Sequence, residues 1–187
     1  MDCRYLQIVS MAMLIFGAAA QAQTVGLELG LVETGPVGGA KASGDRIAFD
    51  LLDRFAPYGR DILSFASQRL ISRGTNNGGA ILQEQIYGDA IEAVWQWMWP
   101  ATYRWHPWLG GGVGYQKERY VNRYRIERSG YLVEHLPDAS QSGPVIVAVI
   151  DVAQRYGPRL TFGIDVRCER EIAPGRWLWA LSLTLGY

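Results

Sequence analysis

The chain has 187 residues, and its 18 lysines and arginines balance its 18 aspartates and glutamates. Zero net charge without a basic run argues against a nucleic-acid partner. Two histidines and two cysteines leave few side chains for a metal centre or for acid–base catalysis, whereas 22 glycines and 7 tryptophans are many for an ordinary domain.

The first segment has the pattern of a secretory signal peptide. A short polar stretch with Arg4 precedes the apolar run 8–20, and Ala20-Gln21-Ala22 fits an A-x-A cleavage site. The run is too short to cross a bilayer as a helix. Cys3 stands before the run and not at its end, so a lipoprotein signal is not supported.

We expect residues 1–22 to be cleaved and residues 23–187 to form a single domain. Cys168 is then the one cysteine left, so no disulfide can form within the mature chain. An exported domain of this size must gain its stability in another way, and closed strand pairing is one such way.

From residue 24 onward, apolar and polar side chains alternate in short segments separated by Gly, Pro or Asn. Alternation with period two sends the two sets to opposite faces of a strand. In the segment 24–34, Leu27, Leu29 and Leu31 share one face and Glu28 lies on the other. The expected strands cover residues 24–34, 45–55, 61–73, 81–99, 108–115, 145–154, 160–169 and 177–187.

Two of these strands have a more specific pattern. In the segment 106–115, a proline and an aromatic residue precede glycines at positions 110, 112 and 114, and in the segment 177–187 large apolar side chains at every second position lead to the final Tyr187. The chain thereby resembles the small bacterial outer-membrane barrels of the OmpA, OmpX and OmpW types. In that family the final aromatic residue forms part of the assembly signal.

The resemblance implies an all-β fold, an eight-stranded antiparallel up-and-down transmembrane barrel with short periplasmic turns and longer external loops. It also implies the outer membrane of a Gram-negative bacterium as the location. The expected partners are the lipid bilayer, lipopolysaccharide and the outer-membrane barrel assembly machinery, and the external partner is unknown.

The connections between the expected strands differ in length. Segments 56–59, 100–107 and 155–158 are short and rich in Pro or Gly, which suits periplasmic turns. The connections expected outside the cell cover residues 35–44, 74–79, 118–143 and the short 171–175. The segment 118–143 alternates tyrosines with arginines, which could bind lipopolysaccharide phosphates; we favour a hydrated extension of the neighbouring strands.

The inward face of the expected barrel carries charged and amide side chains. An eight-stranded barrel is just wide enough for side chains to fill it, and charges there must pair. We therefore expect a polar network that plugs or nearly plugs the lumen. Its predicted members are Glu28, Asp50, Glu92, Gln96, Asp165, Arg167, Glu169 and Arg176.

Aromatic side chains at the two ends of the strands suit anchors at the membrane interfaces. Tryptophans concentrate around the turn after the fourth strand and at the start of the closing strand. The predicted anchors are Trp97, Trp99, Trp105, Trp108, Trp177, Trp179 and Tyr187.

Catalysis has weak support in the sequence. His106 lies in the tryptophan-rich turn and suits an interfacial position better than the role of a base. His135 lies near Asp138, Ser140 and Ser142, the residue types of an acyl-transfer site, and lipid A palmitoyltransferase barrels also place such residues on the outer side. We expect no catalytic residue, no metal site and no cofactor.

These observations leave four functions open. The favoured one is a non-enzymatic outer-membrane barrel with a plugged or very narrow lumen, acting in envelope integrity or surface interaction through its external loops. The second is a porin-like channel for small or apolar solutes. A lipid A-modifying acyl enzyme using His135 ranks lower, and a soluble periplasmic barrel for apolar ligands would need the Leu and Trp faces inside.

Overall fold

The computed structural model describes residues 24–37, 40–56, 58–75, 81–99, 105–127, 133–156, 160–171 and 176–186. Within these ranges all regular elements are strands. No helix among them is long and apolar enough to span a bilayer. The expected signal peptide, residues 1–22, lies outside the described residues, as does Tyr187.

The strands follow one another in short succession along the chain. Their bounds are β1 Thr24–Val37, β2 Ala40–Ala56, β3 Gly59–Thr75, β4 Ile81–Met98, β5 Trp105–Ile126, β6 Val133–Leu136, β7 Ala139–Tyr156, β8 Leu160–Glu171 and β9 Trp177–Gly186.

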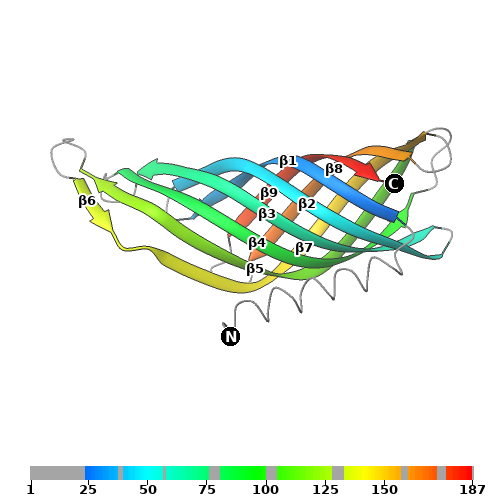
Figure 1. The fold of residues 1–187 in the computed structure, drawn as a ribbon, viewed down its shortest axis with the longest axis horizontal. Coiled ribbons are helices and arrows are strands. Elements are labelled where there is room, and N and C mark those ends of the chain that lie inside the picture. The colour runs from blue at the N-terminus through cyan, green and yellow to red at the C-terminus, as the bar shows by residue number, and fades with distance from the viewer. Residues whose placement is uncertain are drawn as a thin grey trace, which may run out of the picture.

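The sheet closes on itself (Figure 1). Neighbouring strands pair antiparallel, and β1 pairs with β9 from Gly26 opposite Gly186 to Thr34 opposite Leu178. The short β6 and the long β7 pair with successive parts of β5 and together occupy one position in the wall. The protein is therefore an eight-stranded antiparallel up-and-down barrel, and the predicted fold class is confirmed.

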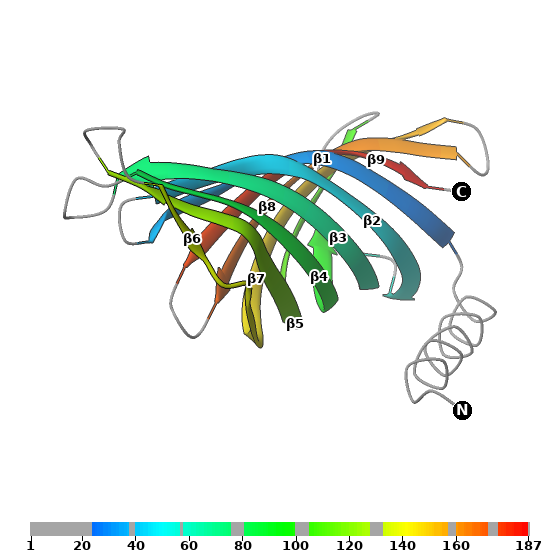
Figure 2. The same cartoon turned by 60° about the vertical axis from the view of Figure 1, so that its left-hand side comes forward.

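The two ends of the barrel differ. The start of β1 and the end of β9 lie at one end, which we call proximal. At the opposite, distal end, β5 and β4 remain paired, while β5 continues beyond its pairing with β7 and pairs with β6 (Figure 2). A register shift between Gln83 and Gln85 of β4 and a positive φ of 51° at Asn122 of β5 mark the start of this distal extension.

Two segments expected to be external connections are mostly strand. In the segment 35–44, β1 continues to Val37 and β2 begins at Ala40; in the segment 118–143, β5 continues to Ile126 and β7 begins at Ala139. Strand pairing depends on backbone hydrogen bonds between strands and not on an apolar face. In these segments both faces carry polar side chains, so the alternation that reveals a strand disappears while the pairing continues.

The outer face of the wall is apolar over a broad belt. Leu29 and Leu183 lie opposite each other on β1 and β9, and both are more than half exposed. Comparable exposed side chains occur on β2, β4, β5, β7 and β8, namely Ile47, Phe49, Ile91, Trp95, Leu109, Val113, Ile146, Ile150, Ile164 and Val166. A belt of this kind around a closed barrel suits contact with lipid.

The inner face mixes two small apolar clusters with buried polar side chains. One cluster comprises Val32, Ala42, Leu70, Ile86, Leu178 and Ala180, and the other comprises Ile62, Val94, Val145, Val147 and Val149. The two clusters fill parts of the barrel between the polar groups.

Glycines on β5 allow the close approach of β4. A Cβ atom at Gly112 would lie 2.0 Å from the backbone oxygen of Ala93, and one at Gly110 would lie 2.1 Å from that of Trp95. A side chain at either position cannot fit without moving the backbone of β4. The glycine-rich strand therefore allows this part of the narrow wall to bend tightly.

Candidate functional site

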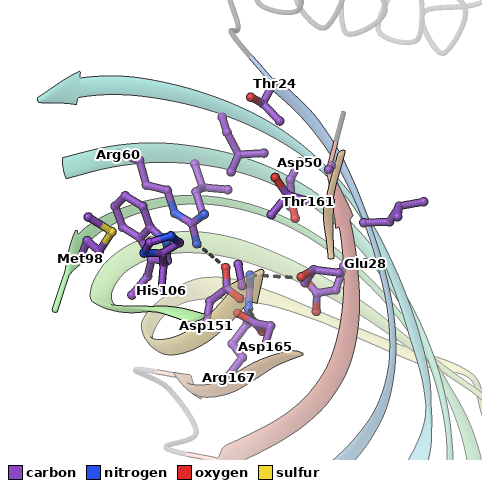
Figure 3. A pocket seen from close by; sticks show the side chains of 18 residues that line it. Thr24, Glu28, Asp50, Arg60, Met98, His106, Asp151, Thr161, Asp165 and Arg167 are labelled. Atoms are coloured by element: carbon purple, nitrogen blue, oxygen red, sulfur yellow. Dashed lines mark hydrogen bonds and ion pairs between the residues drawn. The ribbon is translucent and has the colours of Figure 1, made fainter. Parts of the chain in front are cut away.

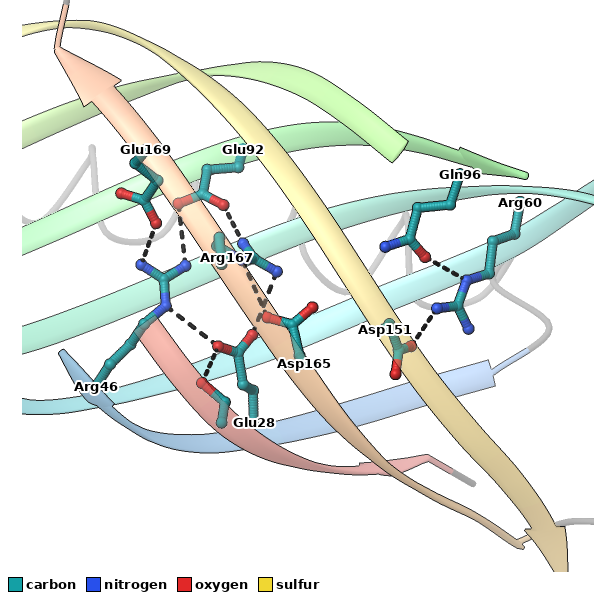
Figure 4. A network of polar contacts seen from close by, with 10 residues as sticks. Glu28, Arg46, Arg60, Glu92, Gln96, Asp151, Asp165, Arg167 and Glu169 are labelled. Atoms are coloured by element: carbon teal, nitrogen blue, oxygen red, sulfur yellow. Dashed lines mark hydrogen bonds and ion pairs between the residues drawn. The ribbon is translucent and has the colours of Figure 1, made fainter. Parts of the chain in front are cut away.

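The middle of the barrel is filled by a ring of four buried charged residues, Glu28, Arg46, Glu92 and Arg167 (Figure 4). Arg46 Nη2 donates to Glu92 Oε1 at 3.0 Å, and Arg46 Nε lies 3.4 Å from Glu28 Oε1. Arg167 Nη1 donates to Glu92 Oε2, and Arg167 Nη2 donates to Glu28 Oε2 at 3.3 Å. Each glutamate thus bridges both arginines, and we call these four residues the central ring.

Three further side chains contact the central ring. Arg46 Nη1 donates to Glu169 Oε1 at 2.8 Å, and Ser182 Oγ donates to Glu28 Oε1 at 2.6 Å. Asp165 Oδ1 lies 3.5 Å from Arg167 Nε. Breaking one of these buried ion pairs would leave an unpaired charge, which costs several kcal/mol.

The central ring crosses the lumen, because its members come from four strands on different sides of the wall. Glu28 lies on β1, Arg46 on β2, Glu92 on β4 and Arg167 on β8, and each is at most 2% exposed. The apolar cluster with Val32 and Ala42 lies distal to the ring, since Val32 stands four positions after Glu28 on β1 and Ala42 stands four positions before Arg46 on the antiparallel β2. A charged layer and an apolar layer therefore fill the barrel in succession.

A cavity of about 200 Å³ opens on the proximal side of the central ring, and we call it the proximal vestibule (Figure 3). Arg60 crosses it: its guanidinium donates to Asp151, its Nε donates to Gln96 Oε1 at 2.6 Å, and it lies 4.3 Å from the centre of the Trp108 ring. Stacking on an aromatic face and a paired carboxylate together stabilise a guanidinium away from water.

A second cavity of about 270 Å³ lies at the distal end, and we call it the distal vestibule. Arg176 Nη2 donates to Glu118 and, at 2.7 Å, to Glu171 Oε1, while Tyr120 donates to Glu118 Oε2 at 2.5 Å. Burial and then the negative charge of Glu118 raise the pKa of Tyr120 above its usual range, so its hydroxyl stays protonated and keeps donating.

The predicted lumen residues divide among these features. Glu28, Glu92, Asp165, Arg167 and Glu169 meet in or beside the central ring. Asp50 and Asp165 line the proximal vestibule, Gln96 binds Arg60, and Arg176 lies at the distal vestibule. All eight side chains are at most 7% exposed.

Five of the predicted interface anchors lie on the outer face of the barrel and one lies inside it. Trp97, Trp99, Trp105, Trp177 and Trp179 are exposed on the outer face by 45 to 62%. Trp108, which the sequence predicts as an anchor, is 3% exposed and lies inside the barrel against Arg60. That prediction is wrong, because Trp108 shares the inward parity of the β5 glycines.

Four buried charged residues that complete these clusters, Arg46, Arg60, Glu118 and Asp151, were not among the predicted lumen residues. Arg46 has the same parity as Asp50 in the segment 45–55, and that parity could have identified it. Glu118 belongs to a segment expected to be a connection, and Arg60 precedes a strand with weak alternation.

The two histidines lie in different surroundings. His106 lines the proximal vestibule, whereas His135 lies exposed on β6 with its ring 5.1 Å from that of Tyr124. Ser142, one of the serines considered with His135, accepts a hydrogen bond from Tyr115 at 3.0 Å. Among the described residues, no three His, Cys, Asp or Glu side chains are placed to hold a metal ion.

No protein-family model matches the chain, and the search of curated proteins found no similar sequence. Solved structures do resemble it. Neisserial surface protein A has 12% identical residues over 87% of this chain and 94% of its own, with a TM-score of 0.56. The outer membrane protein OprG of Pseudomonas aeruginosa has 12% identical residues over 89% of this chain and 96% of its own, with a TM-score of 0.58. The chain therefore has the fold of small outer-membrane barrels.

Proposed function

We propose that this protein is a non-enzymatic outer-membrane barrel with a closed lumen, which acts in envelope integrity or surface interaction through its distal end. The likeness to outer-membrane barrels supports the location, and the apolar belt on the outer face supports contact with lipid. The proximal end, which holds both ends of the described chain, then faces the periplasm and the extension of β5 and β6 faces the exterior.

The central ring carries this proposal. A solute crossing the lumen would have to separate Arg46 and Arg167 from Glu28 and Glu92, all of them almost fully buried. Breaking a buried ion pair leaves a charge without a partner, which costs several kcal/mol. Four such contacts make a spontaneous opening rare.

Basic side chains on the outer face support lipopolysaccharide as a partner. Arg69, Tyr87 and Arg119 stand in one row across β3, β4 and β5, and Arg69 lies 5.8 Å from the Tyr87 ring. The row lies on the distal side of the apolar Ile91, where headgroup phosphates begin if the belt spans the hydrocarbon region. Guanidinium groups suit phosphate. The assembly machinery remains the expected partner of the closing strand β9.

A porin-like passage for small solutes is the second candidate, because the barrel is hollow on both sides of the filled section. Among the described residues, the central ring and the two apolar clusters lie between the proximal and distal vestibules. Passage would require Arg46 or Arg167 to exchange partners.

A swelling assay on liposomes separates the two candidates. The folded protein is reconstituted into vesicles loaded with a large polymer, which are then diluted into iso-osmotic arabinose, glycine or sodium chloride. The closed barrel leaves the vesicles as stable as those without protein. Swelling at a rate proportional to the protein content would instead support the channel.

A further inference from the structure

The proximal vestibule contains more acidic than basic side chains. Its ionisable lining consists of Glu28, Asp50, Asp151, Asp165, Arg60, Arg167 and His106. Arg60 forms an ion pair with Asp151, and Arg167 also forms an ion pair with Glu92 of the central ring. Even when Arg46, which pairs with Glu28 and Glu92, is counted, three guanidinium groups cannot balance the four carboxylates of the lining together with Glu92, so the vestibule attracts a positively charged group.

Three of these carboxylates have an oxygen without a hydrogen-bond partner. The atoms are Oδ1 of Asp50, of Asp151 and of Asp165, and the side chains are 7, 6 and 3% exposed. Asp50 in addition forms no ion pair with any other described residue. Asp165 Oδ1 lies 3.5 Å from Arg167 Nε, so a missing donor is indicated by Oδ1 of Asp50 and of Asp151, because buried polar atoms are normally satisfied.

Two of the carboxylates are direct neighbours across the sheet. Asp151 of β7 and Asp165 of β8 are register partners, and both side chains point into the barrel. Like charges opposite each other on paired strands repel. A cation that contacts both would remove this repulsion, whereas each guanidinium present contacts only one of the pair.

Glycines keep space open beside these oxygens. A Cβ atom at Gly163 would lie 3.0 Å from Asp151 Oδ1 and 2.7 Å from Thr184 Oγ1. A Cβ atom at Gly26 would lie 3.3 Å from Cβ of Asp50. Any side chain at either position would narrow the space in front of the carboxylates.

The spacing and the walls of the vestibule indicate the kind of cation. No three of the acidic or histidine side chains among the described residues are close enough to hold a metal ion together. Leu52, Ile62, Met98 and Ala153 line the same cavity of about 200 Å³. Separate acceptor groups around an apolar wall suit a short aliphatic chain with N–H donors at its ends.

We propose that the proximal vestibule binds a small aliphatic diamine in its ammonium form, with one ammonium group between Asp151 and Asp165 and the other at Asp50. The ligand enters from the periplasmic side if the proximal end faces the periplasm. Binding requires no opening of the central ring, so it is independent of whether the lumen conducts.

Equilibrium dialysis of radiolabelled putrescine against the folded, detergent-solubilised protein tests the proposal. Saturable binding is expected, and Asp50→Asn should weaken it at least tenfold, because this substitution removes a charge without breaking an ion pair. Asp45→Asn is the matched control, since Asp45 lies on the outer face of the same strand and its loss should leave binding unchanged. Heat-modifiable migration on a gel verifies that each variant is folded.

Competition with the wild-type protein gives a second test that needs no variant. Unlabelled 1,4-butanediol, which has the same length without the charge, should not displace putrescine, whereas cadaverine should. The proposal is overturned if putrescine shows no saturable binding, if Asp50→Asn binds as the wild type does, or if magnesium chloride displaces putrescine as well as cadaverine does. None of these results changes the expectation for swelling of liposomes.

Discussion

Arg46 Nη1 lies 2.8 Å from Glu169 Oε1, although the two residues are 123 positions apart and their strands are not neighbours. Two strands, β1 and β9, separate β2 from β8 in the wall, so this contact crosses the lumen. Cross-lumen contacts of this kind tie distant parts of the barrel together and fill it at the same time.

The stability of the barrel should depend on Glu92 because this carboxylate bridges two arginines. Replacing it by Gln keeps its shape but leaves Arg46 and Arg167 facing each other with less compensation. We expect Glu92→Gln to lower the free energy of unfolding by about 3–5 kcal/mol. Urea titration of the folded fraction in lipid vesicles measures this quantity.

Glu33→Gln provides the control for that experiment, because Glu33 pairs with Lys41 on the surface at 3.5 Å and its side chain is 60% exposed. An exposed pair contributes about 0–1 kcal/mol. Equal effects of Glu92→Gln and Glu33→Gln would show that the central ring does not support the fold.

Adjacent glycines on β5 should differ sharply in their tolerance of a methyl group. In Gly112→Ala the new Cβ would lie 2.0 Å from the backbone oxygen of Ala93, whereas in Gly111→Ala its nearest contact is 3.2 Å from the oxygen of Val147. Overpacking costs about 1–3 kcal/mol or more, so we expect Gly112→Ala to lose at least that much stability and Gly111→Ala much less. Refolding yield into detergent micelles, followed by gel mobility, compares the two; equal yields would contradict the described approach of β4 and β5.

The inward position of Trp108 predicts how tryptophan fluorescence responds to lipid. Trp97 and Trp108 stand at nearly the same height on β4 and β5, since Met98 pairs with Trp108, yet Trp97 is 57% exposed and Trp108 is 3% exposed. In single-tryptophan variants, brominated lipid should quench Trp97 and leave Trp108 nearly unaffected. Strong quenching of Trp108 would place it on the outer face.

The proposed orientation can be checked by labelling cysteines in intact cells. Val133 on β6 is 59% exposed at the distal end, and Tyr58 is 61% exposed in the turn after β2 at the proximal end. With Cys168 replaced by Ser, a membrane-impermeant maleimide should label Val133→Cys at once and Tyr58→Cys only after permeabilisation. The reverse order would invert the barrel in the membrane.

The sequence predicted the strands of the barrel better than the side-chain contacts inside it. Where the outer face is apolar, as in the segments 24–34 and 177–187, alternation revealed both the strand and its inward residues. Alternation disappears where both faces carry polar side chains, as at Lys117, Glu118 and Arg119, so the distal part of β5 and with it Glu118 were expected in a connection. The pairing partners of the charges depend on which strands lie across the lumen, and no local pattern contains that information.

Trp108 shows a second limit. A tryptophan close to a turn rich in other tryptophans is typical of a membrane interface. Its inward parity was visible in the spacing to the β5 glycines, but the residue that makes an inward indole favourable, Arg60, comes from another strand. Whether such a tryptophan faces inward depends on side-chain partners that only the closed barrel brings together.

The central claim is that buried charges close the lumen, and electrical recording in a planar lipid bilayer tests it most directly. The purified, folded wild-type protein should insert without any steady unit conductance in 1 M potassium chloride over the voltages that the bilayer withstands. An open porin inserted into the same bilayers is the positive control for the assay. Reproducible unit conductance of the wild-type protein would contradict the account.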